Sequence, residues 1–361
     1  MEGETLVMPD PLHYSFFDID LACAFPDDIT ARWDLLYNHF RSASIDEPHI
    51  RVTVDQRDDD RYTLRVNDTV QAVSHDDVML RLQDLIQNHV LPIVRSHVLW
   101  HGALWSVEGR GIMILGASGL GKTTLSLAHA LSGGHVLSDE IAAWHPDAMR
   151  MSGFPRALAV RPDSLTLLGD RRTHPHLMLD EEKAMVPLIA DVAGTAVPLS
   201  AICVLQRPLD PAVHGQKALC EMQVRAPDTA WRDALQLRRP DAVLTPHPDG
   251  DDWWRCQHLG HLPTQILEEA VRGNGAVLAG FHRDARRKPV FSGPPVMEDV
   301  DHDIAVELAL AELINGREWI DRMGALRLMT MVRTALRPAR CVRCVPGKLE
   351  ETLVAIRQLG D

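Results

Sequence analysis

Residues 116–123 read Gly-Ala-Ser-Gly-Leu-Gly-Lys-Thr and complete the phosphate-loop pattern G-x-x-x-x-G-K-[ST], the Walker A motif. The apolar residues 111–115 predict a short buried strand before the loop, and residues 124–131 predict a helix after it, ended by two glycines. Glycine lets a backbone approach phosphates closely, and the N-terminus of a helix favours negative charge. This order of strand, loop and helix predicts a binding site for a nucleoside triphosphate.

Two residues of the loop have separate roles toward the nucleotide. Lys122 can reach the β- and γ-phosphates, and the Thr123 hydroxyl can complete the coordination shell of Mg²⁺. We therefore expect ATP and Mg²⁺ as ligands. The predicted nucleotide-binding residues are Gly116, Ser118, Gly119, Gly121, Lys122, Thr123 and Thr124.

The composition limits what the rest of the chain can bind. The chain of 361 residues is long enough for one large domain or two ordinary ones, and its net charge of −13 argues against a nucleic-acid surface. No apolar run approaches the roughly 20 residues that span a bilayer, and the acidic N-terminus lacks the features of a signal peptide. We expect a cytoplasmic protein that binds neither nucleic acid nor membrane, and self-association into a homo-oligomer is left open.

The pattern of predicted secondary-structure elements changes near residue 96. Residues 1–95 predict a small mixed α+β N-terminal domain, and residues 96–361 predict the nucleotide-binding domain with a helical C-terminal part. The stretch 207–300 gives no clear pattern. The other expected elements are helices at 30–40, 76–91 and 349–359, two helices within 304–335 interrupted near Gly316, strands at 49–55, 62–66, 97–107, 135–138 and 199–205, and a hairpin turn at 108–111.

Two acidic residues, Asp139 and Glu140, follow the predicted strand 135–138. In an α/β sheet, the C-terminal end of this strand lies beside the phosphate loop. Asp139 can hold the metal directly or through water, or accept a proton from an attacking hydroxyl, and Glu140 can share the second role. His101, one strand upstream, is a candidate for the same edge, although a lone histidine is more often structural.

Six cysteines are scattered along the chain, which suits a reducing compartment. Cys341 and Cys344 form a C-x-x-C pair, but no second pair follows at zinc-site spacing. Cys256, His258 and His261 complete a metal site with this pair only if the fold brings them together. The structural interpretation is favoured, and a metal or redox site stays open.

Four segments in order resemble the core of the HPr kinase/phosphorylase family: His101-Gly102, the turn 108–111, the loop 116–123, and residues 134–140, which read Gly-His-Val-Leu-Ser-Asp-Glu. That family has a His-Gly strand, a turn, a G-x-S-G-x-G-K-S loop and a Gly-His segment that ends in two aspartates. The order and spacing match over about 45 residues, 99–143.

A looser resemblance extends to the shorter HPr-kinase-related kinases found beside peptide-modifying gene clusters. Their small mixed N-terminal region is similar to residues 1–95. Their Phe-Pro-Arg segment is similar to Phe154-Pro155-Arg156.

The resemblance implies a P-loop nucleotide-binding core of the phosphoenolpyruvate-carboxykinase-like type. It implies a kinase that transfers the γ-phosphate of ATP to a Ser/Thr-type hydroxyl of a peptide or small metabolite. By position, Lys122 and Thr123 bind phosphate and Mg²⁺, Asp139 is the general base or a metal contact, and His101 lies in the catalytic site near the γ-phosphate. Arg156 and Arg161 are candidates for holding the transferred phosphate, with surface positions as an equal alternative.

The chain departs from the family's pattern in three places. Thr123 replaces the commoner serine, Glu140 replaces the second aspartate, and residues 151–156 stand where the family has its Glu-x-Arg-Gly signature, linked there to phosphorolysis. We therefore expect transfer in the forward direction only, with an acceptor other than HPr. Two alternative functions stay open because a fold does not name its function: a P-loop ATPase that drives a partner, and a nucleotide-binding component of a biosynthetic complex.

Overall fold

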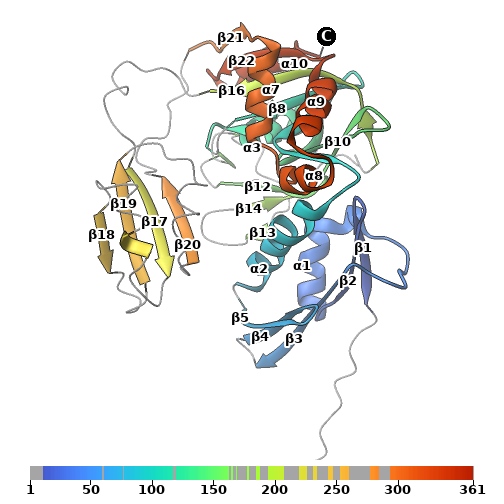
Figure 1. Ribbon diagram of the computed structural model, residues 1–361, viewed down its shortest axis with the longest axis vertical. Helices are drawn as coiled ribbons and strands as arrows, with labels where there is room; N and C mark the ends of the chain where they lie inside the picture. The colour runs from blue at the N-terminus through green and yellow to red at the C-terminus, as the bar shows by residue number, and fades with distance from the viewer. Residues whose placement is uncertain are drawn as a thin grey trace, which may run out of the picture. The chain divides into compact units, whose positions relative to one another are not determined.

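The computed structural model forms two compact units, Met1–Gln206 with Phe291–Asp361, and Arg207–Val290. The fold is mixed α/β with several sheets, some of which contain parallel strands (Figure 1). In the described residues, no helix is both long enough and apolar enough to cross a bilayer. The structure describes residues 11–58, 61–75, 77–116, 119–161, 164–165, 168, 177–178, 184–187, 194–206, 219–225, 231–233, 243–246, 253–259, 277–283 and 293–360.

The N-terminal part of the larger unit contains one five-stranded sheet and two helices. Its elements are β1 (Leu12–Phe16), β2 (Ile19–Ala24), α1 (Asp27–Tyr37), β3 (Ile50–Asp58), β4 (Arg61–Val66), β5 (Thr69–Ser74) and α2 (Val78–Leu85), with the short helical turns η1 (Asn38–Phe40), η2 (Ile86–Val90) and η3 (Leu91–Ile93). The helices and strands predicted here are confirmed, with their ends shifted by a few residues. Trp33 and Tyr37 of α1 are buried in a core that also includes Leu99, Ile141 and Phe154. The predicted domain boundary at residue 95 therefore crosses a shared core, and the boundary itself stays a prediction.

A six-stranded sheet carries the loop strand. Its strands are β7 (Ala103–Val107), β8 (Arg110–Leu115), β9 (His135–Ser138), β16 (Leu199–Leu205), β21 (Val296–Asp299) and β22 (Arg340–Val345). The spatial order is β21-β22-β16-β8-β7-β9. Strand β8 is parallel to β16 and antiparallel to β7, and β7 is antiparallel to β9. Hence β8 and β9 run in the same direction, and both end at the same edge of the sheet.

The predicted hairpin between β7 and β8 is confirmed. Val107 pairs with Arg110, so Glu108 and Gly109 form a two-residue turn. Both turn residues have positive φ, 50° and 78°, which matches the twist of the flanking strands.

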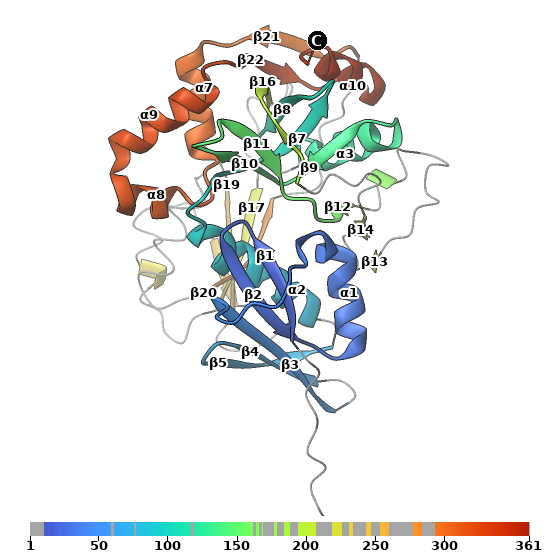
Figure 2. The same ribbon diagram turned by 90° about the vertical axis from the view of Figure 1, so that its right-hand side faces the viewer.

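Helices cover both faces of the six-stranded sheet (Figure 2). The helices are α3 (Lys122–Leu131), α7 (His302–Ala311), α8 (Gly316–Met323), α9 (Ala325–Leu336) and α10 (Leu349–Arg357). In β8, Ile112 and Ile114 pack in one apolar cluster with α3 and α10, whereas Met113 and Leu115 pack in another with α7 to α9. This alternation is the period-2 pattern of a strand buried on both faces.

The single strand predicted at 97–107 is wrong. The chain there forms β7 and a separate strand, β6 (Val98–His101), which belongs to a second sheet of order β15-β11-β10-β6, with β10 (Ile141–His145), β11 (Arg150–Gly153) and β15 (Ala196–Val197). Gly102 separates the two strands, and a Cβ there would lie 2.8 Å from the Leu115 side chain and 2.9 Å from the Ile114 carbonyl oxygen. The chain thus passes too close to β8 for any side chain at the point where it moves between sheets.

The C-terminal region contains three helices between 302 and 336 rather than the predicted two. The first break, after α7, includes the buried residue Asn315, and the second occurs at Gly324, whose φ of +85° ends α8. The predicted helix at 349–359 is confirmed as α10.

Two smaller sheets complete the described part of the chain. In the larger unit, β12 (Leu158–Val160), β13 (Leu177–Met178) and β14 (Ala184–Val186) form a sheet of order β12-β14-β13. In the other unit, β17 (Leu219–Arg225), β18 (Val243–Pro246), β19 (Trp253–Leu259) and β20 (Val277–Arg283) form an antiparallel sheet of order β18-β19-β17-β20.

The Asn315 side chain joins the start of α8 to β6 and to the segment before it through three hydrogen bonds. Its side-chain nitrogen donates to the carbonyl oxygens of Val94 (2.8 Å) and His97 (2.7 Å), and its oxygen accepts from the Leu99 backbone N–H (3.0 Å). Asn315→Ala should lower the free energy of unfolding by about 2–4 kcal/mol, because each buried polar group left unpaired costs ~1–3 kcal/mol. Urea denaturation measures this change. The exposed residue Asn38 supplies the control, since Asn38→Ala should cost less than about 0.5 kcal/mol, and equal losses in the two variants would contradict the assignment.

Candidate functional site

The loop between β8 and α3 depends on glycine backbone geometry. Gly116, Gly119 and Gly121 have φ values of 139°, 82° and 93°, a region that other residues rarely adopt. At Gly116 a Cβ would also lie 2.8 Å from the Leu205 carbonyl oxygen. The helix begins directly after the loop, with the Leu125 N–H bonded to the Gly121 carbonyl at 2.8 Å. Ser118 lies outside the described residues.

Lys122, the first residue of α3, is buried, with 7% of its surface exposed. Its ammonium group donates a hydrogen bond to the Gly116 carbonyl oxygen, so the side chain folds back over the loop. Burial lowers the pKa of Lys122, and the negative charges of Glu312 and Asp139 act in the opposite direction. The lysine is therefore a desolvated cation held between a carbonyl oxygen and two carboxylates.

Asp139 directly follows β9 and is 3% exposed. Burial raises the pKa of its carboxyl group, whereas Arg156, the hydrogen bond from Thr123 and the charge of Lys122 lower it. In the described part of the chain, Asp139 Oδ1 has no hydrogen-bond partner. A buried carboxylate oxygen without a partner is costly, so a ligand bound to this oxygen would offset that cost.

Glu140 and Arg156 form an ion pair next to Asp139. Arg156 is 4% exposed and its charge acts on the pKa of Asp139 and of His101. Glu140 also accepts a hydrogen bond from the Gln87 side chain at 3.3 Å. The guanidinium therefore faces two carboxylates and one imidazole.

His101, the last residue of β6, lies at the same edge. Its backbone N–H donates to the Glu312 carbonyl (2.8 Å), and the N–H of Gly102 donates to the Glu140 carbonyl (2.9 Å). Burial lowers the pKa of His101 to about 4, and the positive charges of Lys122 and Arg156 contribute in the same direction. The imidazole is consequently neutral at pH 7.

The structure brings most of the predicted site residues together. Lys122, Thr123, Asp139, Glu140, Arg156 and His101 interact with one another through the bonds and charges described above. Thr124 donates a hydrogen bond to the Ser164 hydroxyl at 2.8 Å, and its role toward a nucleotide stays a prediction. Arg161 is exposed, which agrees with the surface position that was one of its two alternatives.

Sequence reasoning missed Glu312 and Gln87. Glu312 follows α7, and burial raises the pKa of its carboxyl group while Lys122 opposes that shift. Leu313 forms a β-bridge with Trp100, which holds this segment against β6. Neither residue belongs to a local motif, and Glu312 lies 190 positions after Lys122 in the chain, so no spacing in the sequence could have identified it.

The C-x-x-C pair does not form a chelating site. Cys341 and Cys344 both lie in β22, where positions three apart face opposite sides. Accordingly, Cys341 belongs to the cluster with α7 to α9, and Cys344 to the cluster with α3 and α10. Cys344 instead shares a thiol hydrogen bond with Cys203 of β16. His261 lies outside the described residues.

Thr123 and Asp139 are the residues that fit a divalent cation. No group of three or more His, Cys, Asp or Glu side chains that could hold a metal occurs among the described residues. Mg²⁺, however, is usually held by one or two protein oxygens together with phosphates and waters. The unpartnered Asp139 Oδ1 beside the Thr123 hydroxyl suits that mode.

Chemically, the arrangement can hold an anion and move a proton. Glycine-rich backbone and a buried ammonium lie at the N-terminus of α3, where an anion is favoured. A buried carboxylate with a free oxygen lies beside them.

No protein-family model matches the chain, and no curated protein matches it.

The pKa of His101 predicts how the stability of the protein depends on pH. The imidazole titrates near 6.5 in an unfolded chain and at about 4 in the folded one, so the unfolded state binds more protons between these values. The stabilisation is complete above pH 6.5 and is lost as the pH falls toward 4. His101→Gln should therefore reduce the fall in unfolding free energy between pH 7 and pH 5, as measured by urea denaturation at both pH values.

Part of the fall should remain in this variant, because burial also lowers the pKa of His97 and of His129 to about 4. His89→Gln, at an exposed position, is the control and should leave the pH dependence unchanged. An unchanged pH dependence in His101→Gln would contradict the neutral, buried state of His101.

Proposed function

We propose that this protein is an ATP-dependent kinase that transfers the γ-phosphate to a hydroxyl of a peptide or small metabolite. The observation that carries the proposal is the shared position of Lys122, Thr123 and Asp139 at the start of α3, with the Asp139 Oδ1 atom left without a described partner. A general anion site needs the lysine and the glycine loop. It does not need a buried carboxylate beside them, which would repel phosphate unless a cation or a reacting hydroxyl lay between.

The charges of the site match the needs of phosphoryl transfer. Lys122 holds the β- and γ-phosphates, exchanging its bond with the Gly116 carbonyl for one with phosphate oxygens. The Thr123 hydroxyl would hold Mg²⁺, which would neutralise phosphate charge, and the Asp139 carboxylate would either contact this ion, directly or through water, or act as the general base. Arg156, which pairs with Glu140 beside Asp139, is a planar cation that would stabilise the equatorial oxygens if it exchanged this ion pair for the transferred phosphate.

In its alternative role as the general base, Asp139 receives the acceptor's proton. The acceptor hydroxyl donates its hydrogen bond to a carboxylate oxygen, and the proton moves there as the oxygen attacks phosphorus. The raised pKa of Asp139 makes it a better base than an exposed aspartate. Neutral His101 adds no positive charge and can accept or donate one hydrogen bond at this edge.

Two further features support a kinase over other nucleotide-binding functions. The order of the His-Gly strand, the loop and the acidic pair resembles HPr kinase/phosphorylase, whose nucleotide core is of the phosphoenolpyruvate-carboxykinase-like type. The two acids also stand at the end of β9, a strand that runs in the same direction as β8. We place the enzyme in the cytoplasm and expect forward transfer only, since residues 151–156 stand where the family has the Glu-x-Arg-Gly signature of phosphorolysis and do not match it.

The assay that tests the proposal follows the fate of the γ-phosphate. Purified full-length protein is incubated with Mg²⁺ and [γ-³²P]ATP together with a peptide library and a metabolite extract. We expect label in an acid-stable phosphoester of an alcohol. Release of labelled orthophosphate alone, with every acceptor pool, would identify an ATPase and overturn the kinase assignment.

Lys122→Ala should reduce phosphoryl transfer to a small residual rate. Loss of a cation that contacts the charge of the transition state costs about 10²–10³-fold in rate, by analogy with removal of one oxyanion donor. Since Lys122 is buried, Lys122→Gln is the companion variant, because its amide can still donate to the Gly116 carbonyl. The matched control is Lys348→Ala at an exposed position, and ATP turnover that survives in a folded Lys122 variant would remove this lysine from the site.

Asp139→Asn should slow transfer by roughly 10²-fold or more, because the amide keeps the shape of the side chain but cannot accept the proton. Glu140→Gln should act mainly on stability, through the lost ion pair with Arg156. Steady-state kcat and thermal denaturation of both variants separate the two effects. A larger loss of kcat in Glu140→Gln than in Asp139→Asn would show that the two roles are reversed.

A further inference from the structure

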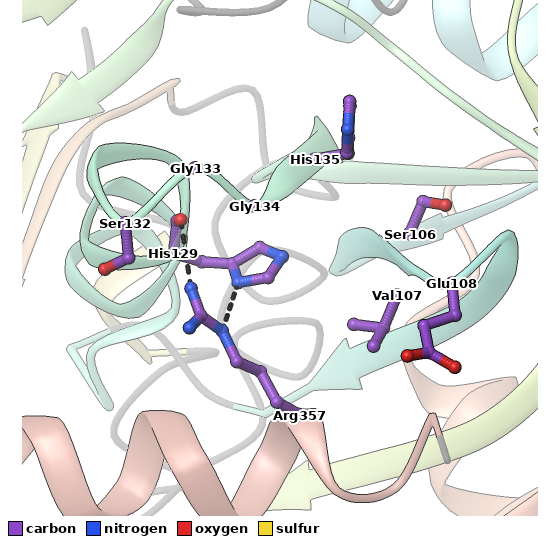
Figure 3. Close-up of a pocket in the computed structure, with 9 residues that line it drawn as sticks. All are labelled: Ser106, Val107, Glu108, His129, Ser132, Gly133, Gly134, His135 and Arg357. Carbon is purple, nitrogen blue, oxygen red and sulfur yellow. Dashed lines mark hydrogen bonds between the residues drawn. The ribbon is translucent and has the colours of Figure 1, made fainter.

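A cavity lies at the far end of α3. Its volume is about 230 Å³, and its lining includes Ser106, Glu108, His129, His135 and Arg357 (Figure 3). Helix α3 starts at Lys122 and has ten residues. At 1.5 Å per residue its two ends lie roughly 15 Å apart, so this cavity is separate from the phosphate loop.

His129 is held rigidly in the cavity wall. Its ring stacks on the Trp105 ring, with centroids 4.3 Å apart and an angle of 12° between the planes. The Trp105 N–H is in turn fixed by the Ser126 hydroxyl at 2.9 Å. On the other side, a Cβ on Gly134 would lie only 2.2 Å from the imidazole ring. Only glycine at position 134 leaves room for the imidazole.

The hydrogen bonds of His129 determine its tautomer. Arg357 Nε–H donates to His129 Nδ1 at 2.9 Å, and a second guanidinium nitrogen donates to the His129 carbonyl at 3.2 Å (Figure 3). A guanidinium can only donate, so Nδ1 is the acceptor and the neutral ring carries its proton on Nε2. Burial lowers the pKa of His129 to about 4, and the positive charge of Arg357 acts in the same direction, which keeps the ring neutral at pH 7.

The Nε2–H group is a buried donor without a described acceptor. His129 is 2% exposed, and Nε2 has no hydrogen-bond partner among the residues that the structure describes. In Figure 3 this nitrogen points away from Arg357 into the space bordered by Ser106 and His135. Leaving such a donor unpaired is unfavourable, yet the stacking on Trp105, the close approach of Gly134 and the two hydrogen bonds from Arg357 all hold it in this orientation.

We propose that this cavity is a binding site for a small carboxylate, one of whose oxygens accepts the His129 Nε2–H hydrogen bond. The Arg357 guanidinium supplies the compensating positive charge. A singly charged group fits better than a phosphate dianion, because Glu108 and the C-terminal end of α3 both place negative charge at the cavity. The proposal does not depend on the kinase function.

The direct test is an NMR titration of the full-length protein labelled with ¹⁵N-histidine. Sodium acetate is the probe, with sodium chloride at equal ionic strength as the reference and sodium phosphate as the competing class. We expect a saturable shift of the His129 Nε2–H resonance with acetate, with a Kd of about 1–10 mM for so small a ligand. His129→Gln, which removes the resonance, identifies it.

Two variants separate recognition from folding. Arg357→Gln should weaken acetate binding about tenfold or more through the lost charge, and His89→Gln, at an exposed position, should leave it unchanged. If Arg357→Gln does not fold, the titration of the wild-type protein still tests whether the cavity binds acetate. No saturable shift with acetate, an equal shift with chloride, or tighter binding of phosphate than acetate would each overturn the proposal.

Discussion

The burial of charge at the start of α3 is the constraint on which the rest of the structure depends. Lys122, Asp139 and Arg156 are all nearly inaccessible to water, and a buried charge is tolerated only when other charges and hydrogen bonds compensate it. Lys122 has a carbonyl and two carboxylates, and Arg156 has Glu140. Removing any one of these groups leaves its neighbours uncompensated, so the cluster has to form as a whole.

Two sheets and the segment between α7 and α8 meet to supply that cluster. The six-stranded sheet contributes the loop and Asp139, and the four-stranded sheet contributes His101. They join at Gly102, where no side chain fits. The segment 312–315 adds Glu312 and is fastened by Asn315 to the backbone before β6. Helix α3 runs from this charged cluster at Lys122 to the cavity at His129, so the same helix contributes a residue to each of the two sites.

Much of the larger unit could be predicted from local patterns. The strand before the loop, the helix after it, the Glu108–Gly109 turn and strand β9 follow from apolar periodicity, glycine placement and loop chemistry, which act between near neighbours. The split at Gly102 could not be predicted in this way. The residues on both sides of it read as one apolar strand, and the reason for the break is the backbone of β8, which passes 2.9 Å from the position of a Cβ.

The sequence by itself determined the loop and the candidates Lys122 and Thr123, because the Walker A pattern needs particular residues at adjacent positions, and it indicated Asp139 as the acid at the end of the next predicted strand. Only the tertiary structure decided that Arg156 pairs with Glu140, that Glu312 faces Lys122, and that Cys341 and Cys344 lie on opposite faces of one strand. It also decided that His129 presents its Nε2–H group to a cavity. These relations join residues far apart in the chain, and their physical cause is the compensation of buried polar groups, which depends on distance in space and leaves no spacing in the sequence.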